Sequence, residues 1–214
     1  MNLGRLTRIP PTALVIEEHT RLLDENGPME EPMRIAGLIL AAGSSTRFGS
    51  PKQLARIGDR TMLETVIDLA REAGLDPIVA VVAPGIAVAP DVVPIVNTQP
   101  EAGLSRSLRM GIEAMPAEVT GAVILLGDQP TLAAATIRAV MDAARNSRPV
   151  IAARADGRLG PPVLLMHSAF GLANDTFGDE GLRSILTRDP ELVAPVDVPT
   201  HAPDVNTPAD LPGG

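Results

Sequence analysis

The sequence has no cysteine, no tyrosine and no tryptophan, and its only aromatic side chains besides histidine are three phenylalanines. Because cysteine is absent, a disulfide framework and a thiolate metal site are both excluded. The shortage of aromatic rings means that the core must be aliphatic, and it removes nearly all the stacking platforms that single-stranded nucleic-acid binders use. A net charge of −8 gives no support for nucleic-acid binding. The chain is therefore expected to have no nucleic-acid partner.

Long apolar runs are missing as well. No run approaches the roughly 20 residues that a membrane-spanning helix needs. Arg5, Arg8 and Glu17 interrupt the N-terminal region in which a signal peptide would have its apolar core. We therefore expect a cytoplasmic protein with no membrane partner.

The length of 214 residues fits one α/β domain with a sizeable core. Residues 1–33 differ from the rest, because they hold four prolines and an acidic stretch. This composition predicts a poorly ordered N-terminal extension over residues 1–33 and a folded domain over residues 34–214.

The most informative stretch runs from Ile35 to Leu54. It begins with a short aliphatic run, which is typical of a strand buried on both faces of a parallel sheet. A glycine-containing loop follows, and backbone N–H groups in such a loop can form an anion-binding concavity. Arg47 adds a planar guanidinium suited to phosphate oxygens, and Lys52 adds a mobile point charge. Strand, loop and two cations together predict a site for the phosphates of a nucleotide.

The spacing in this loop matches neither G-x-x-x-x-G-K-[ST] nor G-x-G-x-x-G. It resembles L-A-A-G-x-S-x-R-x-G-x-x-K, the signature of the sugar-nucleotidyltransferase-like superfamily that includes the MobA-like proteins. Within this superfamily the chain looks most like the MocA-like molybdenum cofactor cytidylyltransferases. A glycine-rich connection with surface charges is the alternative, but it does not explain why strand and cations coincide. The matching residues are Leu40, Ala41, Ala42, Gly43, Ser45, Arg47, Gly49 and Lys52.

Short aliphatic runs alternate with helical patterns along the chain. Thr61 and Glu64 have capping-box spacing, and Gly74 supplies a stop for the helix that follows. Pro94 places its strand at an edge or a bulge. The alternation predicts a three-layer α/β fold with a mostly parallel, Rossmann-like sheet, and the resemblance implies the nucleotidyltransferase type of this fold. The expected strands are 35–40, 78–82, 92–96, 122–126, 149–153, 163–166 and 192–196, with a turn-rich loop at 157–162.

Asp128 follows the aliphatic run 122–126 with one glycine between, which places it at the carboxyl end of a parallel strand. Ligands of open α/β sheets bind at this edge, where the loop carrying Arg47 and Lys52 also opens. Because phosphates repel a carboxylate unless a hard cation lies between them, this placement predicts a Mg²⁺ ion. G-D-Q-P also resembles the motif in which the MocA-like proteins place a metal-binding aspartate. A plain turn aspartate is the alternative.

The C-terminal segment offers a second metal ligand. D-V-N-T-P-A-D-L, which begins at Asp204, resembles the family's D-x-D-T-P-x-D-L, with Asn206 at the third position. The resemblance implies that Asp204 or Asn206 completes the metal site, because an amide oxygen also ligates hard cations. The sequence does not decide between these two residues, and an Asx-type cap is the alternative for both. Asn206 also blurs the distinction from the related guanylyltransferases, which carry asparagines in this segment.

A further block begins at Asn97, whose amide can both donate and accept hydrogen bonds. Gly103 permits close approach of a ligand, and Ser105 and Ser107 offer hydroxyl groups at a helix start. Such groups can read a pyrimidine edge, although a helix cap at Ser105 is the alternative. The block resembles the family's N-x-x-x-x-x-G-x-S-x-S-L-x-x-G. The expected nucleotide-binding residues are Leu40, Ala41, Ala42, Gly43, Ser45, Arg47, Lys52, Asn97, Gly103, Ser105 and Ser107.

Two later blocks resemble the family's substrate side. One contains G-P-P-V-L and resembles G-x-P-V-L, although family members often have histidine where Pro161 stands. The other, G-D-E-G-L-R, matches G-D-x-G-x-R. Ordinary surface residues are the alternative. The acceptor-binding set that the resemblance implies is Gly160, Pro161, Asp179, Gly181 and Arg183.

These blocks occur in the family's order over about residues 35–212. The resemblance implies transfer of CMP from CTP to a phosphorylated pterin-type acceptor, molybdopterin or molybdenum cofactor, with release of pyrophosphate. Arg47 and Lys52 would hold phosphates and Asp128 would hold Mg²⁺, so these three residues form the expected catalytic set. A molybdoenzyme or its chaperone is the implied protein partner, and a monomer or weak dimer is expected.

Two other functions stay open. One keeps the chemistry but uses GTP or another phosphorylated acceptor. The other is a non-catalytic nucleotide-binding maturation partner of a molybdoenzyme, and the carboxylate of Asp128 argues against it because binding alone needs no metal ligand. Ala42 favours CTP. The related guanylyltransferases resemble L-A-G-G in this stretch, with glycine at the position of Ala42. The methyl group of Ala42 narrows the space for a base.

Overall fold

The computed structural model of the chain describes residues 33–43, 45, 48–146 and 148–212. These residues belong to one compact unit, Met33–Gly214. The extension predicted for residues 1–33 lies outside the described residues apart from Met33, so it stays a prediction. Within the described part of the chain, no helix is both long enough and apolar enough to cross a membrane.

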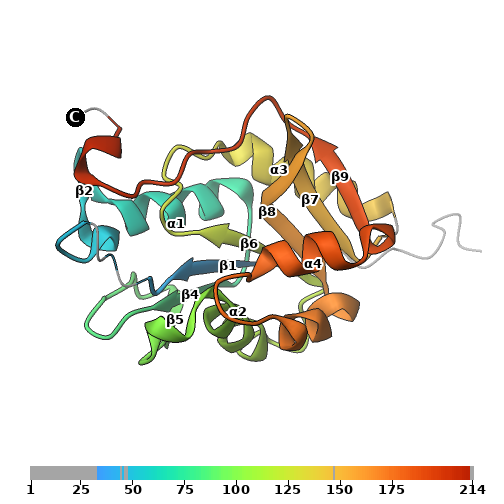
Figure 1. Cartoon of the computed structure of the whole chain (residues 1–214), viewed down its shortest axis with the longest axis horizontal. Helices are drawn as coiled ribbons and strands as arrows, with labels where there is room; N and C mark the ends of the chain where they lie inside the picture. Colours follow the sequence, from blue (N-terminus) through green and yellow to red (C-terminus); the bar gives the residue numbers. More distant parts are fainter. Residues whose placement is uncertain (1–32, 44, 46–47, 147, 213–214) are drawn as a thin grey trace, which may run out of the picture. The chain divides into compact units, whose positions relative to one another are not determined.

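Seven strands of the described unit form one sheet in the order β5-β4-β1-β6-β8-β7-β9 (Figure 1). Strand β8 runs antiparallel to β6 and β7, whereas every other pair of neighbours is parallel. The mostly parallel α/β sheet predicted from the sequence is therefore confirmed. Pro94 lies in the edge strand β5, as expected. The strands are β1 Ile35–Ala41, β4 Ile78–Val82, β5 Val92–Val96, β6 Gly121–Leu126, β7 Val150–Ala155, β8 Arg158–Met166 and β9 Val193–Asp197, and a separate pair is β2 Arg56–Ile57 with β3 Arg60–Thr61.

Strand β1 lies inside the sheet and is buried along its whole length. It pairs with β4 on one side and with β6 on the other, and all of its residues are buried. Because successive side chains of a strand point to opposite faces, Ile39 packs into the cluster on one face and Leu38 into the cluster on the other. A continuous aliphatic run is what a strand covered on both faces requires.

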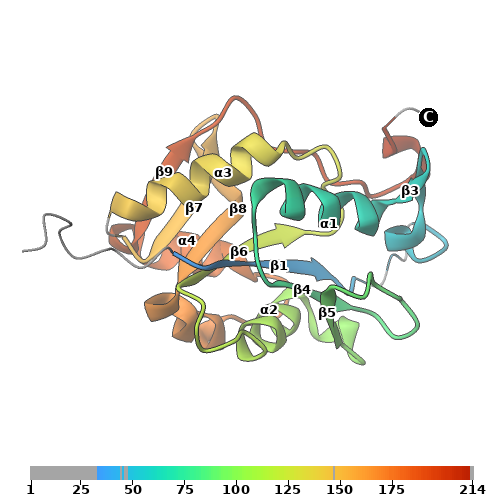
Figure 2. The same ribbon diagram turned by 180° about the vertical axis from the view of Figure 1, so that it is seen from behind.

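Helices cover both faces of this sheet, which gives the three predicted layers (Figures 1 and 2). Val66 of α1 and Ile137 of α3 pack in one cluster, while Leu108 of α2 and Ile185 of α4 pack in the other. The α-helices are α1 Met62–Ala73, α2 Leu104–Glu113, α3 Ala134–Asp142 and α4 Leu182–Arg188. Short 3₁₀ helices are η1 Lys52–Leu54, η2 Pro100–Ala102, η3 Ala143–Asn146, η4 His167–Asp175, η5 Pro190–Leu192 and η6 Pro208–Asp210.

Helix α1 begins and ends at the predicted residues. The Glu64 N–H donates to Thr61 Oγ1, and the Thr61 N–H donates to Glu64 Oε2 at 2.7 Å, which completes the capping box. This backbone hydrogen bond to the carboxylate lowers the pKa of Glu64 below its ordinary value. Gly74 ends the helix with a φ of 87°, a left-handed conformation that glycine adopts without strain.

The prediction of a turn-rich loop at residues 157–162 is wrong, because strand β8 already begins at Arg158. Strands β7 and β8 form a hairpin whose two turn residues, Asp156 and Gly157, both have positive φ. Asp-Gly is the preferred pair for such a tight turn, and the number of prolines and glycines in the segment concealed this signal. The register shifts opposite Pro161 and Pro162, since Ala152 pairs with 163 and Ala153 with 160. Prolines lack the N–H that a ladder needs.

Candidate functional site

A pocket of about 450 Å³ lies at the carboxyl ends of β1 and β6. This is the edge of a parallel sheet at which α/β proteins bind ligands. The pocket brings together Lys52, Asp128 and Asp204, which are far apart in the sequence. Its wall is formed by Leu40, Ala41, Ala42, Gly43, Lys52, Gln53, Pro100, Gly103, Leu104, Ser107, Leu126, Gly127, Asp128, Asp179 and Asp204.

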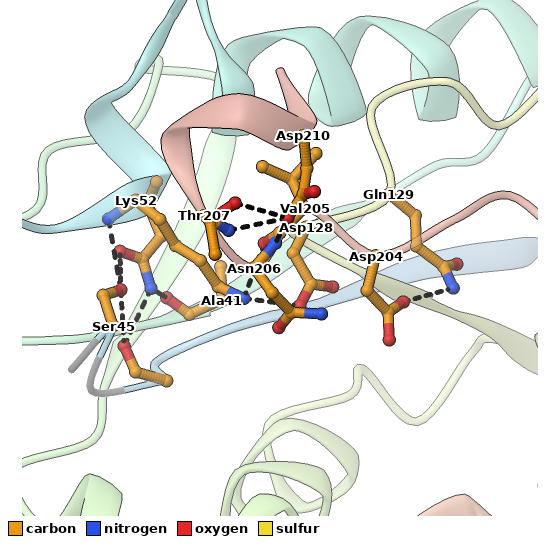
Figure 3. A network of polar contacts seen from close by, with 12 residues as sticks. Ala41, Ser45, Lys52, Asp128, Gln129, Asp204, Val205, Asn206, Thr207 and Asp210 are labelled. Atoms are coloured by element: carbon orange, nitrogen blue, oxygen red, sulfur yellow. Dashed lines mark hydrogen bonds and ion pairs between the residues drawn. The ribbon is translucent and has the colours of Figure 1, made fainter. Parts of the chain in front are cut away.

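Lys52 and Asp128 are paired directly in this pocket. Lys52 Nζ donates to Asp128 Oδ2 at 2.7 Å and to the Val205 carbonyl oxygen at 3.1 Å (Figure 3). The Val205 N–H in turn donates to the Asp128 carbonyl oxygen at 2.8 Å, which ties the C-terminal segment to the end of β6. An ammonium group therefore lies against the carboxylate that was predicted to hold a metal ion.

Asp204 lines the same pocket, and a buried amide holds its carboxylate. Gln129 is 5% exposed, and its Nε2 donates to Asp204 Oδ1 at 2.9 Å (Figure 3). Asp128, Asp179 and Asp204 place three carboxylates in the wall, whereas Lys52 is the only cationic side chain among the described wall residues. A polyanion entering this pocket would need an added cation to offset that negative charge.

The donor set fits a Mg²⁺ ion that is shared with a bound ligand. Among the described residues, no group of three or more His, Cys, Asp or Glu side chains is placed to hold a metal ion by itself. Mg²⁺ commonly takes one or two protein carboxylates and completes its shell with phosphate oxygens and water. Asp128 and Asp204 supply that number of carboxylates. Asp204 is part of the pocket wall and Asn206 is not, which favours Asp204 as the second ligand.

The start of the glycine loop after β1 forms part of the pocket wall. Ala42 and Gly43 line the wall, whereas Ser45 supports the loop, because its Oγ accepts from the Lys52 N–H at 3.1 Å. Arg47 lies outside the described residues, so its phosphate-binding role stays a prediction.

Only part of the block that begins at Asn97 reaches the pocket. Gly103 and Ser107 line the wall. Asn97 is fully buried behind it, where Nδ2 donates to Ser107 Oγ at 3.0 Å and Oδ1 accepts two hydrogen bonds from protein donors. Ser105 Oγ accepts from the Gly181 N–H at 3.0 Å. In this structure Asn97 and Ser105 support the wall instead of facing a base.

Asp179 is the one expected acceptor residue that lines the described pocket wall; Gly160, Pro161, Gly181 and Arg183 do not. The close contact between Gly103 and the loop at Gly178 explains how Asp179 reaches the pocket. A Cβ added at Gly103 would lie 2.4 Å from the Gly178 carbonyl oxygen. Only glycine allows these two loops to approach so closely.

Sequence reasoning missed Gln53, Gln129 and Val205. Gln53 and Gln129 are polar yet buried, and each directly follows a predicted site residue in the sequence, Lys52 or Asp128. That adjacency was the available signal. The apolar side chain of Val205 carries no signal, because its contribution is made by its backbone.

The sheet, the glycine loop after β1 and the acidic pocket at the carboxyl edge define an α/β domain of the nucleotidyltransferase fold. The chain belongs to the MobA-like NTP transferase domain family, whose model matches residues 37–196. This membership confirms the superfamily inferred from the sequence, but not the MocA-like subtype.

Several solved structures are similar to this chain. Rv0371c from Mycobacterium tuberculosis H37Rv is 31% identical, with a TM-score of 0.71 over 83% of this chain and 96% of that chain. Rv0371c in complex with manganese is 29% identical, with a TM-score of 0.68 over 82% and 94%. CMP:2-keto-3-deoxy-manno-octonic acid synthetase complexed with CTP is 14% identical, with a TM-score of 0.62 over 82% and 94%, and shows the fold alone.

Among curated proteins, the bifunctional protein GlmU from Clavibacter sepedonicus is 36% identical over 152 residues, which are 64% of this chain and 30% of that protein. The GlmU of Hyphomonas neptunium is 38% identical over 112 residues, 48% of this chain and 24% of its own length. The chain thus spans less than a third of the curated relatives that it matches.

Proposed function

We propose that this protein transfers a nucleoside monophosphate from a nucleoside triphosphate to a phosphorylated acceptor and releases pyrophosphate. The observation that carries the proposal is the joint placement of the Ala42–Gly43 backbone, the Lys52 ammonium and two carboxylates in one pocket. Backbone amides and an ammonium suit phosphate oxygens, and paired carboxylates suit the metal ion that accompanies a nucleotide.

In this reaction an acceptor phosphate oxygen attacks the α-phosphorus of the nucleotide. The bond from that phosphorus to the bridging oxygen breaks, and pyrophosphate leaves with the bonding electrons. A phosphate monoester is already anionic, so no general base is needed, and positioning with charge neutralisation carries the catalysis. Asp128 and Asp204 would hold Mg²⁺, which when bound neutralises charge on the phosphates. Lys52, which lines the same pocket, would hold the leaving phosphates.

CTP is the proposed nucleotide, and a phosphorylated pterin of the molybdenum cofactor type is the proposed acceptor. The support is the colinear resemblance to the MocA-like cytidylyltransferases, together with the wall position of Ala42. Under this proposal a molybdoenzyme or its chaperone receives the product. Asp179, which lines the pocket, would lie on the acceptor side.

Pyrophosphate release from CTP and from GTP, each with Mg²⁺ and molybdenum cofactor, tests the proposal. We expect release that depends on both metal and acceptor, and more from CTP. Binding of CTP without any release would instead indicate a non-catalytic nucleotide-binding partner. Equal release from GTP would refute the preference, and release with a different phosphorylated acceptor alone would refute the acceptor.

Ala42→Gly tests the cause of the preference. The variant should relax discrimination against GTP if the methyl group restricts the space for the base. Because Ala42 is 3% exposed and packs in a core cluster, the melting temperature must be measured alongside. An unchanged ratio of CTP to GTP turnover in a stable variant would show that the methyl group does not select the base.

A further inference from the structure

Gln53 is a buried polar side chain inside the pocket wall. It lies in η1, directly after Lys52, and is 2% exposed. Its Nε2 donates to the Ala41 carbonyl oxygen at 2.8 Å and to the Gly43 carbonyl oxygen at 3.0 Å. Both hydrogens of the amide are therefore used on the backbone at the end of β1 and the start of the glycine loop.

The acceptor end of the same amide is used as well. Ser45 Oγ lies 3.3 Å from Gln53 Oε1 and equally far from the Gly43 carbonyl oxygen, so these two acceptors share its one hydrogen, and it accepts from the Lys52 N–H at 3.1 Å. Ser45 has a φ of 53°, a conformation that is uncommon for a residue with a side chain. The amide of Gln53 and the hydroxyl of Ser45 thus join the beginning of the loop to η1, where the loop ends.

These contacts fix which way the loop backbone faces. In a trans peptide the C=O and the following N–H point in opposite directions. Holding the Ala41 carbonyl against Gln53 therefore turns the Ala42 N–H away from Gln53. Among the described residues, Gln53 is the side chain that donates to the Ala41 carbonyl oxygen.

We propose that Gln53 is a positioning residue that presents the Ala41–Gly43 backbone to the phosphates of the bound nucleotide. It acts through the loop and does not itself take part in the reaction. This inference rests on the proposed function for the identity of the ligand, but the ordering of the loop by Gln53 is independent of any ligand.

Two variants separate positioning from packing. Gln53→Met keeps the length and removes both donors. Gln53→Glu keeps the shape, but its ionised carboxylate faces two carbonyl oxygens without a hydrogen to donate, whereas the protonated acid regains one donor. Thr176→Val is the matched control, because Thr176 is fully buried and the change removes its hydrogen bond to the Ala173 carbonyl oxygen.

The first measurement is amide hydrogen exchange of the nucleotide-free protein. Gln53→Met should speed exchange in the segment 40–54 by about tenfold or more, while Thr176→Val leaves this segment unchanged. Exchange in that segment that is identical to wild type would overturn the ordering role. This result does not depend on whether any nucleotide binds.

The second measurement is CTP affinity with Mg²⁺, by titration calorimetry. Gln53→Met should weaken CTP binding by about tenfold or more, equivalent to about 1.4 kcal/mol, and Thr176→Val should not. If Gln53→Met does not fold, Gln53→Glu decides the matter alone. Its CTP affinity relative to that of wild type should rise as the pH is lowered from 8 to 5. A ratio of the two affinities that stays constant with pH would overturn the inference. Wild type that does not bind CTP would refute the proposed function, while the exchange result would still decide the ordering role.

Discussion

Lys52 Nζ lies 2.7 Å from Asp128 Oδ2, which joins the loop after β1 to the end of β6. The two side chains are 15% and 23% exposed, so water screens their attraction only in part. Lys52 is also the only lysine of the chain, whose other basic residues are arginines and histidines. A compact ammonium therefore lies where Asp128 would hold a divalent cation, so the two cations would compete for the same carboxylate.

Lys52→Met should bind Mn²⁺ more tightly than wild type in the absence of nucleotide. The variant removes the ammonium that competes for the Asp128 carboxylate, and we expect a gain of about threefold to tenfold, or about 0.7–1.4 kcal/mol. With CTP present the order should reverse, because Lys52 is then needed at the phosphates. Titration calorimetry of Mn²⁺ with and without CTP measures both values.

Arg145→Met is the matched control, since it removes one positive charge from an exposed residue of η3. It should leave Mn²⁺ affinity within twofold of wild type under both conditions. If Lys52→Met weakens Mn²⁺ binding without nucleotide, the ammonium does not compete with the metal, and the assignment of Asp128 as its ligand is wrong.

Asp128→Asn should abolish nucleotidyl transfer and leave the fold intact. Loss of one carboxylate from the metal site should cost several kcal/mol of transition-state stabilisation, on the order of 3 kcal/mol or more, as for other electrostatic groups that act on developing charge. Pyrophosphate release at saturating Mg²⁺ measures the effect. The control is Asp142→Asn, which makes the same change in net charge at an exposed residue at the end of α3 and should be fully active. Near wild-type turnover by Asp128→Asn would show that Asp128 is not part of the site.

The sequence predicted the strands that build the site because their signals are local. The aliphatic run of β1 and the capping box of α1 need only neighbouring residues to be recognised. Asp128 was placed at the pocket by the general rule that ligands bind at the carboxyl edge of a parallel sheet. These predictions required no knowledge of long-range contacts.

The supporting contacts were out of reach of such reasoning. The hydrogen bond from Gln129 to Asp204 joins residues 75 positions apart, and nothing local to either one specifies the other. The same holds for Asn97, whose polar groups are used inside the protein. A pattern of residue types indicates that an amide is near a site, but only the packing of the fold shows whether the amide faces the ligand or the protein.

Glu64→Gln should reduce stability at neutral pH and have no effect in acid. The pKa of Glu64 is lowered by the hydrogen bond from the Thr61 N–H, so its charged form stabilises the folded state. A lowered folded-state pKa contributes stability that is present above the unfolded pKa and is lost as the pH falls through the folded one. Glutamine keeps the capping geometry without the charge, and we expect a neutral-pH difference of about 0.3–1 kcal/mol.

Urea unfolding of wild type and Glu64→Gln at pH 7 and at pH 3 measures this difference. The control is Glu72→Gln, at an exposed residue near the other end of the same helix. Its difference in stability from wild type should not show the loss at pH 3 that is expected for Glu64→Gln. A Glu64→Gln difference that persists unchanged at pH 3 would mean that the carboxylate charge does not contribute to the cap.

Gly127→Ala should destabilise the protein and disturb the site together. A Cβ at this position would lie 2.6 Å from Ala41 Cβ and 3.3 Å from the Leu40 carbonyl oxygen, so the ends of β1 and β6 must move apart. Overpacking of this kind costs about 1–3 kcal/mol, and the shift should also weaken Mn²⁺ binding, because Asp128 follows directly.

Gly171→Ala, where a Cβ meets nothing within 4 Å, should be neutral in urea unfolding and Mn²⁺ titration. Adding Ala41→Gly to Gly127→Ala removes the nearest clashing atom and should restore part of both losses; no recovery in either measurement would show that the contact between these strand ends does not set the position of Asp128.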